Sequence, residues 1–269
     1  MCELFGKTRE GFYSVKQDTI KDRQIKEEEI LSMTREIREI APGIGAYKVF
    51  LILKNVFEKD MIGRDRFYSL IHLNHLMLKP ERRRHTTNSN HNYRKYKNLI
   101  KDFKPNNINQ LWVADITYIE TDSGVCYLHL LTDAYSHEII GWTLSESLMA
   151  DNTLNALDRA LDMFKHYDLS SLIHHSDRGS QYCCNRYVDK LKDQHISISM
   201  TEDSNPTDNA VAERVNGIIK QEWIYRMKRF KDLEDATNKI TKIIDFYNHT
   251  RPHMSNGMLT PYEMRRQCG

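Results

Sequence analysis

Three carboxylates are the side chains whose type and spacing could carry out chemistry in this sequence: Asp115, Asp177 and Glu213. Asp115 lies inside a run rich in β-branched and aromatic residues, Asp177 follows a second such run, and Glu213 lies in a run with helical periodicity. A buried acid is costly unless it is paired, hydrogen-bonded or bound to a metal ion. If two strand acids and one helix acid converge, they form an oxygen-only site that suits Mg²⁺ or Mn²⁺.

The elements that must position these acids occur in a mixed α/β order. Runs of β-favouring residues predict strands over 111–120, 125–132, 138–144, 172–175 and 196–200. Apolar residues at helical spacing predict helices over 150–164, 187–192, 208–225 and 233–247. Three strands followed by alternating helices and strands indicate a mixed five-stranded sheet with flanking helices.

The helix predicted over 208–225 allows a geometric test of the third acid. At about 100° per residue, one face gathers the aliphatic residues Val211, Val215, Ile218 and Ile219, and the opposite face gathers Glu213, Asn216 and Lys220. We therefore expect the aliphatic stripe to pack on the sheet, and Glu213 and Lys220 to face a common cleft. An acid for a metal ion and a cation for a phosphate suit a site that handles a nucleic-acid backbone. A solvated polar face is the alternative explanation.

The N-terminal part of the chain has helical patterns. Residues 1–40 form a charged helical segment, and two shorter helices are predicted over 46–57 and 64–77. Two short helices joined by a tight turn are compatible with a helix-turn-helix unit, and an ordinary helical hairpin is the alternative. The second helix opens with Arg64 and Arg66, whose side chains we expect to reach phosphates or base edges of DNA.

The net charge of +2 hides a split along the chain. Residues 1–109 hold 22 Lys and Arg against 14 Asp and Glu, whereas residues 110–269 hold 17 against 23. The basic excess is concentrated in a linker over 79–109, which lacks an apolar period, and we expect it to follow a nucleic-acid backbone. A solvated linker that binds nothing specific is the alternative. The candidate DNA contacts in this linker are Arg82, Arg83, Arg84, Arg94 and Lys95.

Composition argues against a membrane protein and against a disulfide framework. An apolar share of 40% in 269 residues allows a buried core for one large domain and a smaller one. No apolar run approaches the roughly 18 residues of a membrane helix, and the first residues have no signal-peptide pattern. The five cysteines are scattered and include no Cys-x-x-Cys pair, so neither disulfides nor a zinc knuckle are indicated. We expect an intracellular protein.

Four ordered sequence blocks give the chain a family resemblance. They are Trp112-x-x-Asp-Ile-Thr-Tyr-Ile119, His175-Ser-Asp-Arg-Gly-Ser-Gln-Tyr182, Asp208-Asn-Ala-x-x-Glu213 with Lys220, and Tyr247-Asn-x-x-Arg-Pro-His253 followed by Thr260-Pro-x-Glu263. With the 35 residues between the second and third acids, they resemble the ribonuclease H-like fold of DDE transposases and integrases. The match is closest to a bacterial insertion-sequence transposase family encoded in two overlapping reading frames. The chain resembles the downstream, catalytic product over about residues 40–266.

The resemblance implies that Asp115, Asp177 and Glu213 form the catalytic triad and bind Mg²⁺ or Mn²⁺, with two ions. It implies that Lys220 contacts DNA near the terminal phosphate. The implied reaction is DNA cleavage and strand transfer at the insertion-sequence ends, through a circular intermediate that is later inserted. The implied partners are the terminal inverted repeats, target DNA, at least one further copy of the chain, and the upstream-frame product, either fused or separate. The implied location is the bacterial cytoplasm, on DNA.

Residues beside the second acid allow two interpretations each. Adjacent residues of a strand point to opposite faces, so we expect His174 to pack in the core and His175 to orient its neighbours or to contact DNA. Arg178 and Gln181 lie in a glycine-containing turn and either bind phosphate or cap the following helix. Both are therefore candidate DNA contacts.

These predictions describe an α/β, ribonuclease H-like protein preceded by a small all-α helix-turn-helix region. The predicted parts are an N-terminal helical segment (1–40), a helix-turn-helix region (41–78), a basic linker (79–109), an integrase-type catalytic core (110–230), and a C-terminal helix and tail (231–269).

Three alternatives stay open. The first is a phage- or retrovirus-type integrase, although no cysteine lies between Cys2 and Cys126 for the zinc domain of the retroviral type. The second is a catalytically inactive DNA-binding regulator, which the presence of all three acids disfavours. The third is a nuclease that only hydrolyses, and the basic front half favours an enzyme that must also hold specific DNA ends.

Overall fold

The computed structural model describes residues 8–79, 96–202 and 209–268, and for 9–19 the backbone alone. The chain divides into two compact units, residues 1–80 and 81–269. Five candidate DNA contacts of the basic linker lie outside the described residues: Arg82, Arg83, Arg84, Arg94 and Lys95.

The N-terminal unit is helical. Its helices are α1 (Arg9–Ile40), α2 (Ala46–Phe57) and α3 (Arg64–Leu73), with a 3-10 turn over Glu58–Asp60. Fully buried side chains from all three helices form its core: Ile30, Val49, Leu53, Phe67 and Ile71. The last helix was predicted to reach residue 77 and ends four residues earlier, because His75 adopts a left-handed φ of 56°. The Asn74 side-chain nitrogen also donates a hydrogen bond to the carbonyl oxygen of Leu70. This oxygen lies in the last turn, where carbonyl groups lack partners within the helix.

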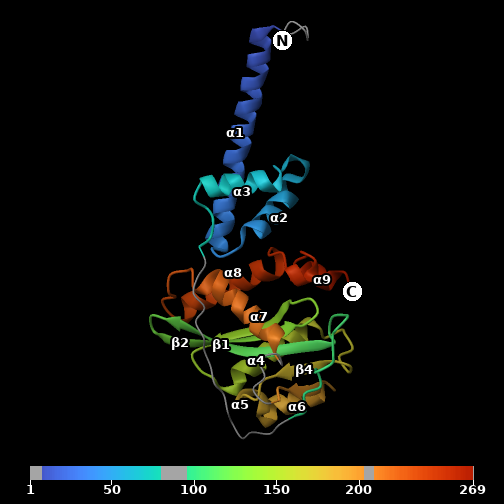
Figure 1. Ribbon diagram of the computed structural model, residues 1–269. Coiled ribbons are helices and arrows are strands. Elements are labelled where there is room, and N and C mark those ends of the chain that lie inside the picture. Colours follow the sequence, from blue (N-terminus) through green and yellow to red (C-terminus); the bar gives the residue numbers. More distant parts are fainter. Residues whose placement is uncertain (1–7, 80–95, 203–208, 269) are drawn as a thin grey trace. The chain divides into compact units, whose positions relative to one another are not determined.

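The second unit is built on a five-stranded mixed sheet, which confirms the predicted fold class (Figure 1). The strands are β1 (Leu111–Thr121), β2 (Gly124–Asp133), β3 (Ile139–Ser145), β4 (Ile173–Ser176) and β5 (Ser197–Met200). Their spatial order is β3-β2-β1-β4-β5. β1 is antiparallel to β2 and parallel to β4, so the first and fourth strands, far apart in sequence, are neighbours in the middle of the sheet.

Alternate residues of β1 pack into two different layers, one on each face of the sheet. Trp112 and Ala114 belong to the larger core, formed with α4 (Ala150–Met163), α5 (Ser180–Cys183) and α6 (Asn185–Asp193). Leu111 and Val113 point to the other face and pack with Ala212 of α7 (Ala210–Ile219). Because side chains alternate along a strand, the odd-numbered Asp115 falls on the α7 face.

The C-terminal elements cover an edge of the sheet. They are α8 (Leu233–His249), a 3-10 turn (Met254–Asn256) and α9 (Pro261–Arg266), which begins with a capping box between Thr260 and Glu263. Figure 1 shows α8 on the same side of the sheet as α7. The Asn248 amide accepts from the nitrogen of Ile139 at 3.0 Å and donates to its oxygen at 2.9 Å. α8 thereby satisfies backbone groups of the edge strand β3.

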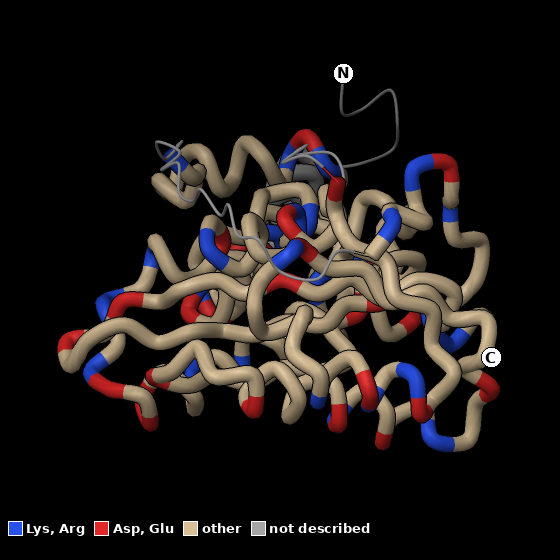
Figure 2. The backbone as a smooth tube through the Cα atoms, turned by 90° about the horizontal axis from the view of Figure 1, so that it is seen from below, with Lys and Arg blue, Asp and Glu red and all other residues tan. Residues whose placement is uncertain are grey.

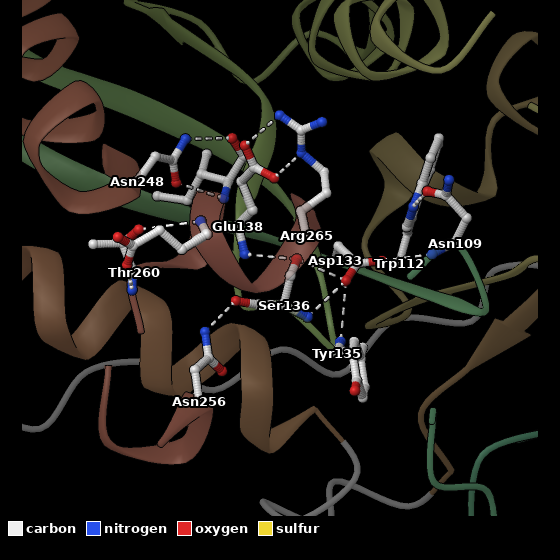
Figure 3. A network of polar contacts seen from close by, with 12 residues as sticks. Asn109, Trp112, Asp133, Tyr135, Ser136, Glu138, Asn248, Asn256, Thr260 and Arg265 are labelled. Atoms are coloured by element: carbon white, nitrogen blue, oxygen red, sulfur yellow. Dashed lines mark hydrogen bonds and ion pairs between the residues drawn. The ribbon is translucent and has the colours of Figure 1, made fainter. Parts of the chain in front are cut away.

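The connection between β2 and β3 is held by a buried polar network (Figure 3). The Asp133 carboxylate accepts hydrogen bonds from the backbone nitrogens of Asn109, Tyr135 and Ser136. Asn256 donates to the oxygen of Ser136 at 2.7 Å, and Arg265 pairs with the buried Glu138. Segments more than 100 residues apart thus meet at one connection, which ties the tail to the sheet.

Gly141 is required by the close approach of β3 and α4. A Cβ atom at this position would lie well inside van der Waals contact with the Ala156 carbonyl oxygen and at 3.3 Å from the Ala160 Cβ. We expect Gly141→Ala to lower the free energy of unfolding by at least about 2 kcal/mol, since overpacking must displace backbone here. Gly217→Ala in α7 is the control, because a Cβ atom added at that position would meet nothing within 4 Å. Urea unfolding should show a gain of up to about 1 kcal/mol for this control.

Buried histidines make the fold sensitive to acid. His129 is 1% exposed, and burial lowers its pKa to about 4, although Ser147 contributes in the opposite direction. The unfolded chain, with an ordinary pKa of about 6.5, takes up the proton first, so stability is lost as the pH falls from about 6.5 towards 4. His129→Gln should reduce this loss by on the order of 3 kcal/mol in urea unfolding at pH 7 and pH 4.5. The exposed His166→Gln is the control, and an identical loss in both variants would contradict the prediction.

Candidate functional site

Asp115 lies near the middle of β1, where its carboxylate is held from two sides. Its Oδ1 accepts a hydrogen bond from the nitrogen of Ile116 at 2.9 Å, and its Oδ2 accepts one from Asn216 Nδ2 at 2.7 Å. Burial, followed by the charge of Asp177, raises the pKa of Asp115 to about 7, and Glu213 adds to the rise. The charges of both other acids therefore act on this carboxylate.

The strand register places Asp177 beside Asp115. β1 and β4 pair in parallel with Leu111 opposite Ile173 and Val113 opposite His175. Continuing this register by two residues aligns Asp115 with Asp177, on strands about 4.8 Å apart. Asp177 itself follows the last residue of β4, and its Oδ1 accepts from the nitrogen of Gly179 at 2.9 Å. The turn after β4 thus orients the second acid.

Helix α7 carries Glu213 and is attached to β1 by two asparagines. Asn209 Nδ2 donates to the carbonyl oxygen of Ala114 at 3.1 Å, and Asn216 binds the carboxylate of Asp115. Glu213 is exposed, and partial burial raises its pKa. The predicted aliphatic stripe of this helix is buried as expected, except that Val211 is only half-buried. Asn216 was placed on the polar face with Glu213, yet it is only 6% exposed because it reaches Asp115.

Lys220 lies where the helix changes its winding. The predicted helix over 208–225 is regular only to Ile219, and Lys220–Ile224 form a π-helical turn. Such turns are frequent at functional sites. Lys220 Nζ lies 4.5 Å from the centroid of the Tyr118 ring. Burial lowers the pKa of Lys220, and the negative charge of Asp115 partly opposes this effect. Lys220 therefore lies beside Tyr118 of β1 and close enough to Asp115 to interact with its charge.

The donor groups fit a divalent cation by their chemistry. Carboxylate and amide oxygens are ligands of Mg²⁺ and Mn²⁺, and acids with a raised pKa, as Asp115 and Glu213 have, gain from a positive charge between them. Within residues 8–79, 96–202 and 209–268, no group of three or more His, Cys, Asp or Glu side chains is arranged to hold a metal ion. The structure thus brings Asp115, Asp177 and Glu213 to one region, but their side chains do not surround a single point where a cation would bind.

The other residues predicted near the second acid have protein partners. His174 is buried and lies 2.9 Å from the hydroxyl of Tyr187, as expected for packing. His175 is fully buried, with Nδ1 2.8 Å from Ser199 Oγ. It can therefore orient its neighbours, whereas direct DNA contact does not fit this position. Gln181 Nε2 donates to the carbonyl oxygen of Leu148 at 3.1 Å.

Arg178 differs from these residues. It is half-buried, and its Nε is buried without a hydrogen-bond partner among the described residues. A guanidinium N–H without a protein partner suits a phosphate oxygen. Its role in binding phosphate stays a prediction.

The arginines that open α3 form ion pairs within the N-terminal unit. Arg64 pairs with its neighbour Asp65, and Arg66 pairs with Glu27 of α1. The Arg66 pair is partly buried, so DNA contact through this side chain would compete with an existing interaction. In the described part of the chain, basic and acidic positions are interspersed along the backbone (Figure 2).

Comparisons with known proteins identify the family. The integrase core domain family matches residues 105–206, and a second integrase core domain family matches residues 194–261. The transposase for insertion sequence element IS904 of Lactococcus lactis is 31% identical over 260 residues, which cover 91% of this chain and 95% of that protein. The chain belongs to the insertion-sequence transposases with an integrase core. Its core is that of a DDE-type polynucleotidyl transferase.

Two further relatives support this family. The insertion element IS600 uncharacterized 31 kDa protein of Shigella sonnei is 35% identical over 271 residues, covering 99% of this chain and 98% of that protein. The putative transposase for insertion sequence element IS986/IS6110 of Mycobacterium tuberculosis is 35% identical over 165 residues, covering 60% of this chain and 59% of that protein. The transposase similarity therefore extends over nearly the full length of some relatives.

A solved structure shows the same fold. A chain of the simian T-cell lymphotropic virus intasome, in complex with PP2A regulatory subunit B56 gamma, superposes with a TM-score of 0.51. It shares 14% sequence identity, and the match covers 86% of the transposase chain and 74% of the intasome chain. No helix in the described part of the transposase is long and apolar enough to cross a membrane.

Sequence reasoning missed one residue that contacts the acids of this candidate site. Asn216 appeared only as a member of the polar stripe of α7, yet it forms the side-chain hydrogen bond that joins α7 to Asp115. Its position three residues after Glu213 was a usable signal, because residues i and i+3 of a helix are neighbours.

Proposed function

We propose that this transposase cuts and joins DNA at insertion-sequence ends, with Asp115, Asp177 and Glu213 as the acids that hold divalent cations. One observation carries the proposal. The buried carboxylate of Asp115 is aligned with Asp177 by the strand register and is bonded by the helix that carries Glu213. Burial, together with the charges of Asp177 and Glu213, raises the pKa of Asp115, and a perturbed acid of this kind is a candidate for a functional site.

The chemistry consists of two phosphodiester exchanges. In cleavage, water attacks the phosphorus, the bond from phosphorus to the 3′ oxygen breaks, and a free 3′-OH and a 5′ phosphate result. In strand transfer, this 3′-OH attacks a second phosphodiester, so one bond to phosphorus forms and one breaks, releasing another 3′-OH. Neither step needs a covalent bond to the protein.

The side chains have separate roles in these steps. Asp115, Asp177 and Glu213 would hold Mg²⁺ or Mn²⁺, as a pair of ions in the family pattern, and the charge of these ions would activate the nucleophile and stabilise the leaving oxygen. Lys220, next to Tyr118, supplies a positive charge for the terminal phosphate of the DNA. Asn209 and Asn216 fix α7 on β1, so Glu213 is presented from a rigid helix.

DNA binding outside the cleavage site completes the proposal. The basic linker, Arg64 and Arg66 of α3, and Arg178 and Gln181 beside Asp177 bind terminal inverted repeats or target DNA. Because two DNA ends must be held together, the active form is a dimer or larger. The proposal includes an upstream reading frame whose product is fused to this chain or acts with it.

The proposal is tested on DNA that flanks the gene. Labelled duplexes carrying the imperfect inverted repeats are incubated with the purified chain and Mg²⁺ or Mn²⁺. We expect cation-dependent release of a 3′-OH at the repeat end, followed by joined products. Duplexes with scrambled ends are the control. Cleavage without joining would identify a hydrolytic nuclease, and specific binding without cleavage would identify an inactive regulator; both outcomes would overturn the proposal.

A further inference from the structure

Asn216 combines two features at the proposed cation site. It is 6% exposed, and its Nδ2 donates to Asp115 Oδ2 at 2.7 Å. Its Oδ1 is buried as well, and among the described residues this atom has no hydrogen-bond partner. One end of the amide therefore holds the catalytic acid, while the other end is an acceptor that is shielded from water and unused.

An unused buried acceptor is uncommon in native proteins. Most buried polar atoms have a partner, and an exception indicates strain, a catalytic role, or a water molecule or ion that completes the site. The amide of Asn248, by contrast, is also nearly buried and uses both its ends on the backbone of Ile139. Asn209 Oδ1 is also buried without a partner among the described residues, but the nitrogen of Asn209 bonds a backbone oxygen, whereas that of Asn216 bonds a carboxylate.

The surroundings of this oxygen indicate which ligand it takes. Asp115 is next to it and Asp177 is aligned with Asp115 across the sheet, so the local charge is negative. An acceptor oxygen beside a carboxylate suits a cation and not an anion. Asparagine oxygens are accepted ligands of hard divalent cations, together with carboxylates. On α7, Asn216 is also one turn from Glu213, the third acid.

We propose that Asn216 is a further residue of the cation site, in which its nitrogen positions Asp115 and its oxygen contributes to binding of the divalent cation. The inference rests on the proposed function, because it assumes that Asp115 helps to hold that cation. It adds an uncharged oxygen to the three acids and gives a reason for an asparagine at this position of α7.

The test measures cation binding in the absence of DNA. The full chain is titrated with MnCl₂, and free Mn²⁺ is followed by electron paramagnetic resonance while the unfolding temperature is recorded in parallel. We expect Asn216→Ala to weaken Mn²⁺ binding about 10-fold or more, the range found when groups supporting a metal site are removed. Asn216→Asp keeps an oxygen and should bind Mn²⁺ within about threefold of the original chain or more tightly, with an equal or larger rise in unfolding temperature.

Controls separate this inference from the proposed function. Asn248→Ala removes a similarly buried amide far from α7 in sequence and should leave Mn²⁺ affinity unchanged. Asp115→Asn should lose Mn²⁺ binding, and unchanged binding in that variant would overturn the cation site as a whole.

If Asp115→Asn loses binding, Asn216 is judged separately. Unchanged affinity in Asn216→Ala would overturn the inference. Affinity weaker by about 10-fold or more in Asn216→Asp would also overturn it, because the nitrogen alone would then explain the role. If Asn216→Ala does not fold, Asn216→Asp decides by the same criterion.

Discussion

Asp115→Asn is expected to reduce both DNA cleavage and strand transfer at least about a thousandfold while DNA binding is retained. A cation that stabilises the transition state contributes several kcal/mol, and each 1.36 kcal/mol corresponds to a factor of about ten in rate. Asp177→Asn and Glu213→Gln should have effects of the same size, since each removes one negative charge from the oxygen ligands of the cation. The measurements are the labelled-end assay for activity and a mobility shift for binding. Full activity in any one variant would refute its assignment to the triad.

The stability of the same variant helps to distinguish a catalytic acid from a structural one. Burial and the charge of Asp177 raise the pKa of Asp115 to about 7, so its ionised form destabilises the cation-free protein at pH 8. Asp115→Asn should therefore unfold at the same urea concentration as the original chain or at a higher one. Glu120→Gln is the control for activity: this exposed residue of β1 pairs with Arg229, and its replacement should leave cleavage unchanged.

Arg251→Met is expected to lower the free energy of unfolding by about 3–5 kcal/mol, the cost of breaking a buried ion pair by removing one member. Arg251 is 3% exposed at its side chain and binds Glu222 through two hydrogen bonds of 2.7 Å. This pair connects the end of α8 to the π-helical turn that carries Lys220. Urea unfolding measures the loss.

A double variant identifies the source of this effect. Arg251→Met combined with Glu222→Gln removes both charges of the pair and should recover much of the lost stability, because replacing both members of a buried ion pair costs less than removing one. Lys165→Met breaks an exposed pair with Asp162 and should change stability by less than about 0.5 kcal/mol. If the double variant is as unstable as Arg251→Met, the loss comes from packing of the arginine and not from the charge of Glu222.

Local patterns predicted the five strands and most of the helices. The strand over 111–120 was predicted from its β-branched and aromatic residues, and β1 spans Leu111–Thr121. The helix over 46–57 coincides with α2. The secondary structure of such runs depends on short-range conformational preferences and on which face is apolar. Both properties can be recognised from the sequence alone.

Errors arose where a distant residue decides the conformation. The segment 208–225 was predicted as one helix, but Lys220–Ile224 are π-helical, and Glu222 in this turn is bound by Arg251, two residues after the end of α8. His175 was expected to orient its neighbours or to contact DNA, and the structure places it in the interior against Ser199 of β5, which fits the first role. Periodicity cannot locate such partners, because they come from other elements.

By itself, the sequence determined that three acids occur on a strand, after a strand and on a helix, in a mixed α/β order that resembles an integrase core. The tertiary structure decided how they relate to one another. Parallel pairing of β1 with β4 aligns Asp115 with Asp177, and Asn216 joins α7 to the same carboxylate. The physical reason is that a pattern along the chain shows which face a side chain lies on. Whether a polar group on that face is buried, paired or left for a ligand depends on the long-range neighbours that satisfy its hydrogen bonds and charge.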